Sequence, residues 1–142
     1  MSFQWLDMRI AEEKERRERD AMVQERLPRA LGELRENLRA CVDAYRGAFG
    51  NEAAEIAPEE DGVRVTVRHQ RAGRWEDSAR VRVKVVPELP GFSVESGGEP
   101  VSIEVGTLPG DKLLFKHGDH YLTMEQVTQR ILEPVLFPNL QG

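Results

Sequence analysis

The chain has 142 residues, of which 39% are hydrophobic and 32% are charged, and its formal net charge is −5. This length fits one domain with a modest core, and nearly balanced charge with periodic apolar positions argues against a disordered chain. No stretch approaches the roughly 20 consecutive apolar residues of a membrane-spanning helix. We therefore expect an ordinary soluble protein that has no membrane partner.

The single cysteine, Cys41, cannot form a disulfide within the chain. The N-terminal segment is interrupted by Asp7 and Arg9, so it lacks the apolar core of a secretory leader. Both observations favour a reducing, cytoplasmic environment.

The first 26 residues predict a helical arm. Its tip carries five large apolar side chains on both sides of a helical wheel, with Phe3, Leu6 and Ile10 on one side and Trp5 and Met8 on the other. One domain surface cannot bury such a segment all round, so we expect the tip to bind a second copy or another protein. The alternative is that the chain folds back at Pro28 and the tip covers its own sheet.

Residues 11–20 (AEEKERRERD) separate this tip from the rest of the chain and contain almost nothing to bury. Acidic residues precede basic ones by four positions in three pairs: Glu12 and Arg16, Glu13 and Arg17, Glu15 and Arg19. Each pair stabilises an isolated helix by about 0.2–0.5 kcal/mol. The segment is therefore expected to stay helical in water, as a spacer.

From Leu27 onward, apolar residues alternate at spacings of four and three, which predicts a helix with one apolar side. The stripe consists of Leu27, Leu31, Leu34, Leu38, Cys41, Tyr45 and Ala48. Within it, Cys41 is expected to be a buried structural thiol. Pro28 predicts either a kink or a new first turn. Glycines up to Gly50 end the helix, and residues 51–61 are expected to form an acidic linker.

After the linker the apolar period changes to two, which is typical of strands with one buried face. Valines alternate with basic residues in 62–69 and in 79–85, and a turn around Gly73 joins these segments into an antiparallel hairpin. Glycine- and proline-rich turns then separate three further strands and a short last strand around Tyr121. Because every connection is short, we predict an antiparallel meander of five to six strands.

Thr123 followed by Gln126 predicts a capping box for a final helix, which Pro134 kinks or ends. The whole chain thus predicts an α+β fold: a long N-terminal helix, the meander, and a C-terminal helix packed with the first on the valine-rich face of one sheet. Residues 1–26 are expected to form the arm, and residues 27–142 one domain.

The most conspicuous charged pattern is a row of basic residues on the outward face of the hairpin. It consists of Arg64, Arg68, Arg80, Arg82 and Lys84. Such a row is a candidate patch for nucleic acid or for an acidic partner. The next strands place Glu95 and Glu104 on the same face, however, so internally paired charges explain it as well. By strand parity, Trp75 falls on the valine face beside His69, which disfavours nucleic acid.

His117, Asp119 and His120 lie around one turn, and these residue types can bind zinc or another divalent ion. They would need a further ligand from elsewhere, and a Gly-Asp hairpin turn explains the same residues. No zinc-ligand, phosphate-loop or nucleophile motif accompanies them. We therefore expect no metal, no cofactor and no assignable catalytic residue.

These patterns favour a non-enzymatic cytosolic interaction module, of adaptor or chaperone-like type, that forms homo-oligomers through the tip of its arm. Two alternatives stay open. One is a small-ligand-binding or catalytic domain with a pocket between sheet and helices, lined by Tyr45, His69 and Trp75. The other is nucleic-acid binding through the basic face of the hairpin.

Overall fold

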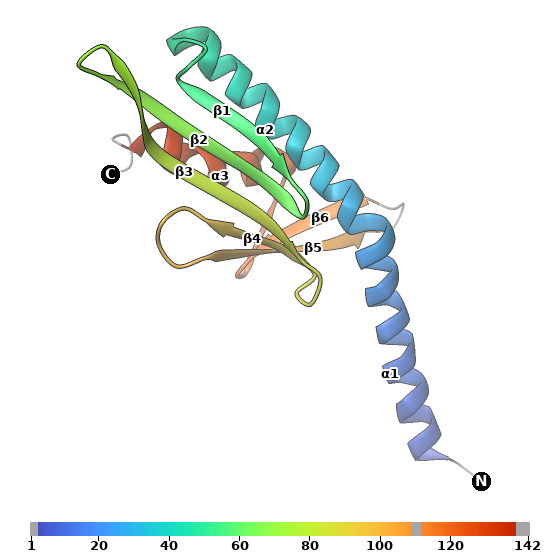
Figure 1. The fold of residues 1–142 in the computed structure, drawn as a ribbon. Coiled ribbons are helices and arrows are strands. Elements are labelled where there is room, and N and C mark those ends of the chain that lie inside the picture. The colour runs from blue at the N-terminus through green and yellow to red at the C-terminus, as the bar shows by residue number, and fades with distance from the viewer. Residues whose placement is uncertain (1–2, 109–111, 139–142) are drawn as a thin grey trace.

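The computed structural model describes residues 3–108 and 112–138, which form one sheet with helices on one face (Figure 1). The helical elements are α1 (Gln4–Ala21), the π-helical turn η1 (Met22–Arg26), α2 (Leu27–Phe49) and α3 (Met124–Leu136). The strands are β1 (Ala54–Glu59), β2 (Gly62–Arg71), β3 (Arg74–Val86), β4 (Gly91–Glu95), β5 (Val101–Leu108), β6 (Lys112–His117) and β7 (His120–Leu122). The predicted α+β fold is confirmed.

In the described part of the chain, seven strands form one antiparallel sheet, and each strand pairs with the next in sequence. The meander is thus confirmed, with more strands than the five to six predicted. The additional strand is β1, which lies within the stretch predicted to be an acidic linker. Its alternation is present but weak: Ala54 is buried and Ile56 partly buried, whereas Glu55 is exposed.

Helix α2 packs its leucine stripe on the valine-rich face of the sheet. Leu34, Leu38 and Val42 are fully buried, in one core with the inward valines of β2 and β3. Burying such side chains stabilises the fold by roughly 1.5–3 kcal/mol each. Cys41, in contrast, is exposed, so the prediction of a buried thiol is wrong. Seven residues of an α-helix turn about 20° less than the two full turns that the four-and-three stripe assumes, so along the helix Val42 replaces Cys41 on the sheet side.

The long helix continues through Pro28. Just before the proline, η1 has π-helical hydrogen bonding, and the backbone N–H of Leu27 donates to the carbonyl of Met22, five residues back. A proline in a regular helix lacks one N–H and clashes with the carbonyl four residues earlier. The wider π turn relieves this conflict, and such turns are an established cause of helix bends. The helix changes direction at this point in Figure 1.

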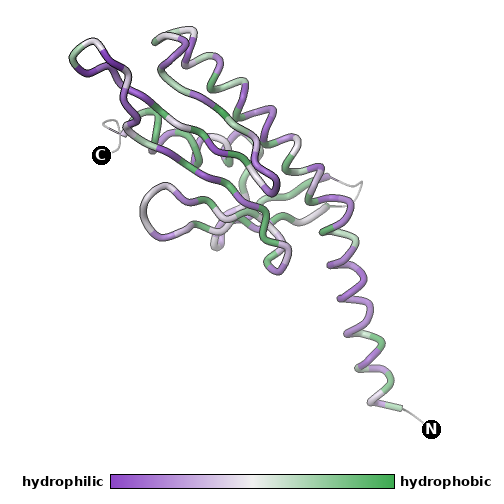
Figure 2. Tube along the Cα trace, viewed as in Figure 1, coloured by the Kyte–Doolittle hydropathy of each residue, from purple (hydrophilic) through white to green (hydrophobic). Residues whose placement is uncertain are grey.

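Helix α1 runs away from the sheet, and none of its residues is buried. In Figure 2 a hydrophilic spacer separates the apolar tip from the rest of the molecule. The alternative in which the arm folds back at Pro28 onto its own sheet is therefore wrong. At the other end of the chain, the capping box of α3 is confirmed: Thr123 Oγ1 accepts from the backbone N–H of Gln126, whose side chain accepts from the N–H of Thr123.

Arg35 ties α2 to the turn between β1 and β2. Its Nη2 donates to the carbonyl oxygens of Glu59 and Gly62, both at 2.7 Å, and its Nε donates to the Gly62 oxygen at 3.1 Å. Gly62 leaves no room for a side chain, because a Cβ there would lie 1.8 Å from the carbonyl oxygen of Val83. The turn is therefore held between a guanidinium on α2 and the backbone of β3.

Replacing Arg35 by alanine is expected to lower the free energy of unfolding by about 1.5–3 kcal/mol, the range for hydrogen bonds to charged groups. Two part-buried carbonyls lose their donor in this variant. Chemical denaturation followed by circular dichroism measures the change. The matched control is Arg39→Ala, at an exposed arginine one turn further along α2, for which less than about 0.5 kcal/mol is expected. Equal effects of the two substitutions would contradict the role of Arg35.

Candidate functional site

The five predicted partner-binding residues lie together at the free end of the arm, here called the tip (residues 3–10). Their exposed fractions are 50% for Phe3, 66% for Trp5, 40% for Leu6, 64% for Met8 and 45% for Ile10. Soluble proteins rarely leave contiguous apolar patches of large side chains uncovered unless the patch takes part in an interaction. The tip is therefore the first candidate for a binding surface.

The spacer behind the tip is held helical by its own charges. Arg16 donates from Nε to Glu13 Oε2 at 3.0 Å, and Arg17 donates from Nε to Glu13 Oε1 at 3.1 Å. These hydrogen bonds lower the pKa of Glu13 to about 2, and the one from Arg16 has the larger effect. The predicted pair of Glu13 and Arg17 is confirmed, whereas Glu12 accepts from Arg9 at 2.9 Å and not from Arg16.

Acidification is expected to reduce the helix content of the arm. The pKa of Glu13 in the folded chain, about 2, lies below its ordinary value of 4.5. Its carboxylate therefore stabilises the helix at neutral pH, and this contribution is lost as the pH falls from about 4.5 to about 2. Circular dichroism at 222 nm should show a smaller loss across this range for Glu13→Gln than for the natural chain.

The control for this titration is Glu18→Gln, which removes a carboxylate from the same helix. Glu18 makes no side-chain hydrogen bond within the residues that the structure describes, so Glu18→Gln keeps the hydrogen bonds at Glu13 and should lose more ellipticity across this range than Glu13→Gln. If Glu13→Gln and Glu18→Gln titrate alike, the stabilisation does not come from the hydrogen bonds at Glu13.

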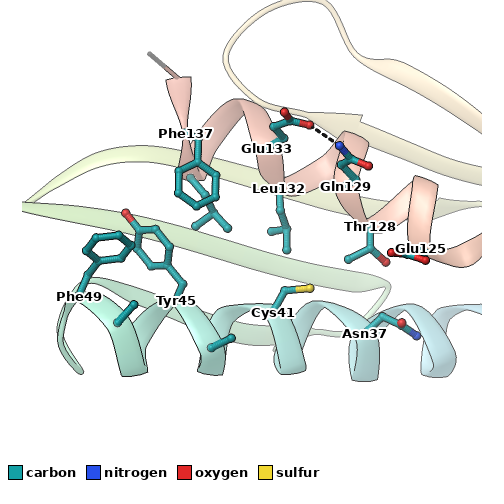
Figure 3. Close-up of a pocket in the computed structure, with 13 residues that line it drawn as sticks. Asn37, Cys41, Tyr45, Phe49, Glu125, Thr128, Gln129, Leu132, Glu133 and Phe137 are labelled. Atoms are coloured by element: carbon teal, nitrogen blue, oxygen red, sulfur yellow. Dashed lines mark hydrogen bonds between the residues drawn. The ribbon is translucent and has the colours of Figure 1, made fainter. Parts of the chain in front are cut away.

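A second apolar surface is a groove between α2 and α3, with a volume of about 610 Å³ and open to solvent (Figure 3). Its wall on α2 consists of Asn37, Cys41, Ala44, Tyr45, Ala48 and Phe49. Its wall on α3, with the residue that follows the helix, consists of Glu125, Thr128, Gln129, Leu132, Glu133, Leu136 and Phe137. The two walls face each other in Figure 3, and apolar side chains line most of the groove.

The groove is aromatic at one end and polar along its rim. The ring of Tyr45 lies 4.8 Å from that of Phe49 and 5.8 Å from that of Phe137, centroid to centroid, the second pair being edge-to-face. Phe49 and Phe137 stay exposed, and burial raises the pKa of the Tyr45 hydroxyl. On the rim, Gln129 Nε2 donates to Glu133 Oε2 at 2.8 Å. A partner with an apolar face and polar edges would fit this surface.

The groove differs from the pocket predicted between sheet and helices. Of the three predicted lining residues, Tyr45 is in the groove, whereas His69 and Trp75 are not. The groove could have been located from the part of the apolar stripe on α2 that does not contact the sheet, at Cys41 and Ala48. These positions match the helix period but fall on the side of α2 that faces α3.

Trp75 lies elsewhere because of a β-bulge in the hairpin. No residue of β2 lies opposite Ser78, and the register shifts there, so that Trp75 lies opposite Gln70 and His69 lies opposite Glu76. The predicted pairing of Trp75 with His69 is therefore wrong. The indole instead covers the end of α2, where its Cζ2 lies 3.5 Å from the position of a Cβ at Gly50.

The predicted row of basic residues lies on β2 and β3, where acidic side chains interrupt it. Arg68 donates to Glu55, and from Nε to Asp77 Oδ1 at 3.0 Å, and these hydrogen bonds raise its pKa. Arg82 Nε lies 2.9 Å from Glu59 Oε1, although the N–H is not aimed at that oxygen. Both acids on β1 belong to the strand that was predicted as a linker.

The other three members of the row are Arg64, Arg80 and Lys84, and the structure gives them no ion pair within residues 3–108 and 112–138. Thr66 lies opposite Arg80, and Ser93 lies opposite Lys84. A row in which two of five cations are already bound by acids of the same sheet is weaker than the continuous basic surface typical of nucleic-acid binding.

At the turn that was weighed as a metal site, His117 and His120 lie opposite each other in the β6–β7 hairpin. The Nδ1 atom of His117 accepts a hydrogen bond from Arg130 Nη1 at 2.9 Å, which occupies the lone pair that a metal would need. Among the residues described, no group of three or more His, Cys, Asp or Glu side chains is arranged to hold a metal ion.

None of the helices in the described ranges combines the length and the apolar character needed to cross a bilayer. The chain matches no protein family, no curated protein and no solved structure against which it was compared. Its function has therefore to be inferred from the tip, the groove and the polar face of the sheet.

Proposed function

We propose that the protein is an interaction module that self-associates through the tip of its arm. The observation that supports this proposal most strongly is the exposure of five large apolar side chains on a helix with no buried residue. Removing apolar surface from water contributes roughly 25 cal/mol per Å². A second molecule that covers the tip would therefore gain binding energy without any change in the rest of the fold.

The spacer supports the same proposal, because it keeps the tip away from the body of its own chain. At a rise of 1.5 Å per residue, residues 11–26 hold the tip roughly 24 Å from the start of α2. The path from α1 through η1 to α2 is helical throughout. The tip could return to its own sheet only if this helix broke, which would cost the backbone hydrogen bonds of the broken turn.

The basic face of the hairpin supports nucleic-acid binding less well, since Arg68 and Arg82 already contact acidic side chains. An interaction module needs a surface that its own chain leaves uncovered, and the tip meets this condition more completely. Self-association is favoured over a different protein partner because the same chain also carries an uncovered apolar groove.

The double substitution Trp5→Asp with Leu6→Asp is expected to reduce the solution mass of the protein from a dimer, or a larger assembly, to a monomer. It places two charges where apolar side chains would be buried, and the resulting monomer should keep its fold, as circular dichroism can check, because its body does not contact its own tip. Light scattering coupled to size-exclusion chromatography measures the mass.

The matched control for this experiment is Gln4→Asp with Ala11→Asp. It adds the same charge at two exposed polar or small residues, one within the tip and one directly behind it, and removes no large apolar side chain, so the assembly should persist. A natural chain that is monomeric at every concentration, or a Trp5→Asp, Leu6→Asp variant with unchanged mass, would overturn the proposal.

A further inference from the structure

We infer that the groove between α2 and α3 is the surface that receives the tip of a second copy, in an antiparallel dimer whose two copies exchange arms reciprocally. The inference rests on the self-association proposed above and adds to it the receiving surface and the geometry. Reciprocal exchange closes the assembly at two copies, because each tip fills one groove and each groove receives one tip.

The shape of the groove fits a helix better than a small ligand. Small-ligand sites usually enclose most of the ligand surface, whereas this groove is open to solvent between two helical walls (Figure 3). An amphipathic helix binds such a groove through side chains three, four and seven positions apart. Phe3, Leu6 and Ile10 have all three of these spacings, and all three side chains are exposed.

The length of the helix brings tip and groove to the same level in an antiparallel pair. Apart from η1, the helical path from residue 4 to residue 49 is regular and unbroken. If the midpoints of two such paths coincide, residue 4 of one copy lies level with residue 49 of the other, and residue 10 with residue 43. The α2 wall of the groove extends from Asn37 to Phe49, so the tip would lie within it.

The same chain cannot supply the occupant. The tip (residues 3–10) and the α2 wall of the groove (residues 37–49) lie at opposite ends of one continuous helical path, and Figure 1 shows the start of α1 far from the end of α2. Within the described residues, the tip is a helical segment whose large apolar side chains are exposed over a length comparable to that of the groove. A second copy therefore offers a matching occupant for each groove.

Charge and size agree with this arrangement. Arg9 of an incoming tip would lie level with residue 44, and Figure 3 places Glu133 across the groove from Cys41, less than one helical turn from that level. Asp7 and Arg9 balance each other, so a docked tip brings no net charge to the groove. Each copy would contribute residues 3–10 and the 13 residues that line its groove, close to the 20–30 residues per partner of a standard interface.

Cys41 provides the first test, because it is the chain's one cysteine and lies exposed in the groove. An Ala11→Cys variant, which leaves the tip unchanged, is treated with a short bis-maleimide. The expected product is a covalent dimer in which mass spectrometry finds the peptide of position 11 joined to that of position 41. At a rise of 1.5 Å per residue these positions are roughly 45 Å apart within one chain, so the link must join two copies.

The control is Ala11→Cys with Cys41→Ala, in which this link must disappear. A link between the two introduced thiols that persists in the control at full yield would show that arms pair with arms. That result would overturn the inference while leaving self-association through the tip intact.

The second test introduces a charge into the groove. Ala48→Glu, at an exposed alanine in the wall, is expected to raise the dissociation constant of the dimer about tenfold or more, because a carboxylate would be buried against an apolar tip. Ala40→Glu makes the same substitution at an exposed alanine of α2 outside the groove and should change the constant less than about threefold. Both variants keep a good helix former at the site.

The outcomes separate the inference from the function on which it rests. If Ala48→Glu and Ala40→Glu dimerise alike while Trp5→Asp with Leu6→Asp dissociates, the tip mediates assembly but the groove does not receive it, and the inference fails alone. If the natural chain is a monomer at every concentration, the proposed function and the inference both fail.

Discussion

The packing of the α2 leucines on the inward valines of the sheet determines where every other part of the molecule lies. These side chains hold α2 against the sheet. The hydrogen bonds from Arg35 to the β1–β2 turn prevent the helix from sliding along its axis. Because η1 joins α1 to α2 without a loop, the direction of the arm follows from the same contacts. Helix α3 then packs beside α2 on the same face, and the groove is the space that remains between them.

The tip and the groove are left uncovered for different reasons. The tip is apolar over most of its circumference, so no position on a single helix-covered sheet could bury it entirely. The groove forms because the apolar stripe of α2 is wider than the contact with the sheet, so that Cys41, Tyr45 and Ala48 turn toward α3 while Leu38 and Val42 turn inward. The chain thus leaves two apolar surfaces exposed, and the proposed dimer would cover each of them with the other.

Periodicity predicts those parts of the structure in which neighbouring residues decide the outcome. The α+β class, the β2–β3 hairpin and the cap at Thr123 all follow from local spacing. Three features do not. Acidic side chains on β1 hide its weak alternation, one extra residue at Ser78 reverses the parity of Trp75, and the groove depends on the distance between two helices far apart in sequence. The apolar tip could be recognised from sequence alone because nothing else in the chain contributes to it.

The π turn has a consequence for the orientation of the arm. An α-helix rotates by about 100° per residue, and a π turn contains about one residue more than the α turn it replaces. Every side chain N-terminal to η1 is therefore offset around the helix axis, by about the angle of one residue, from where the leucine stripe of α2 would place it. The backbone between Met22 and Arg26, at the other end of the arm, therefore determines the direction in which each side chain of the tip points relative to the body.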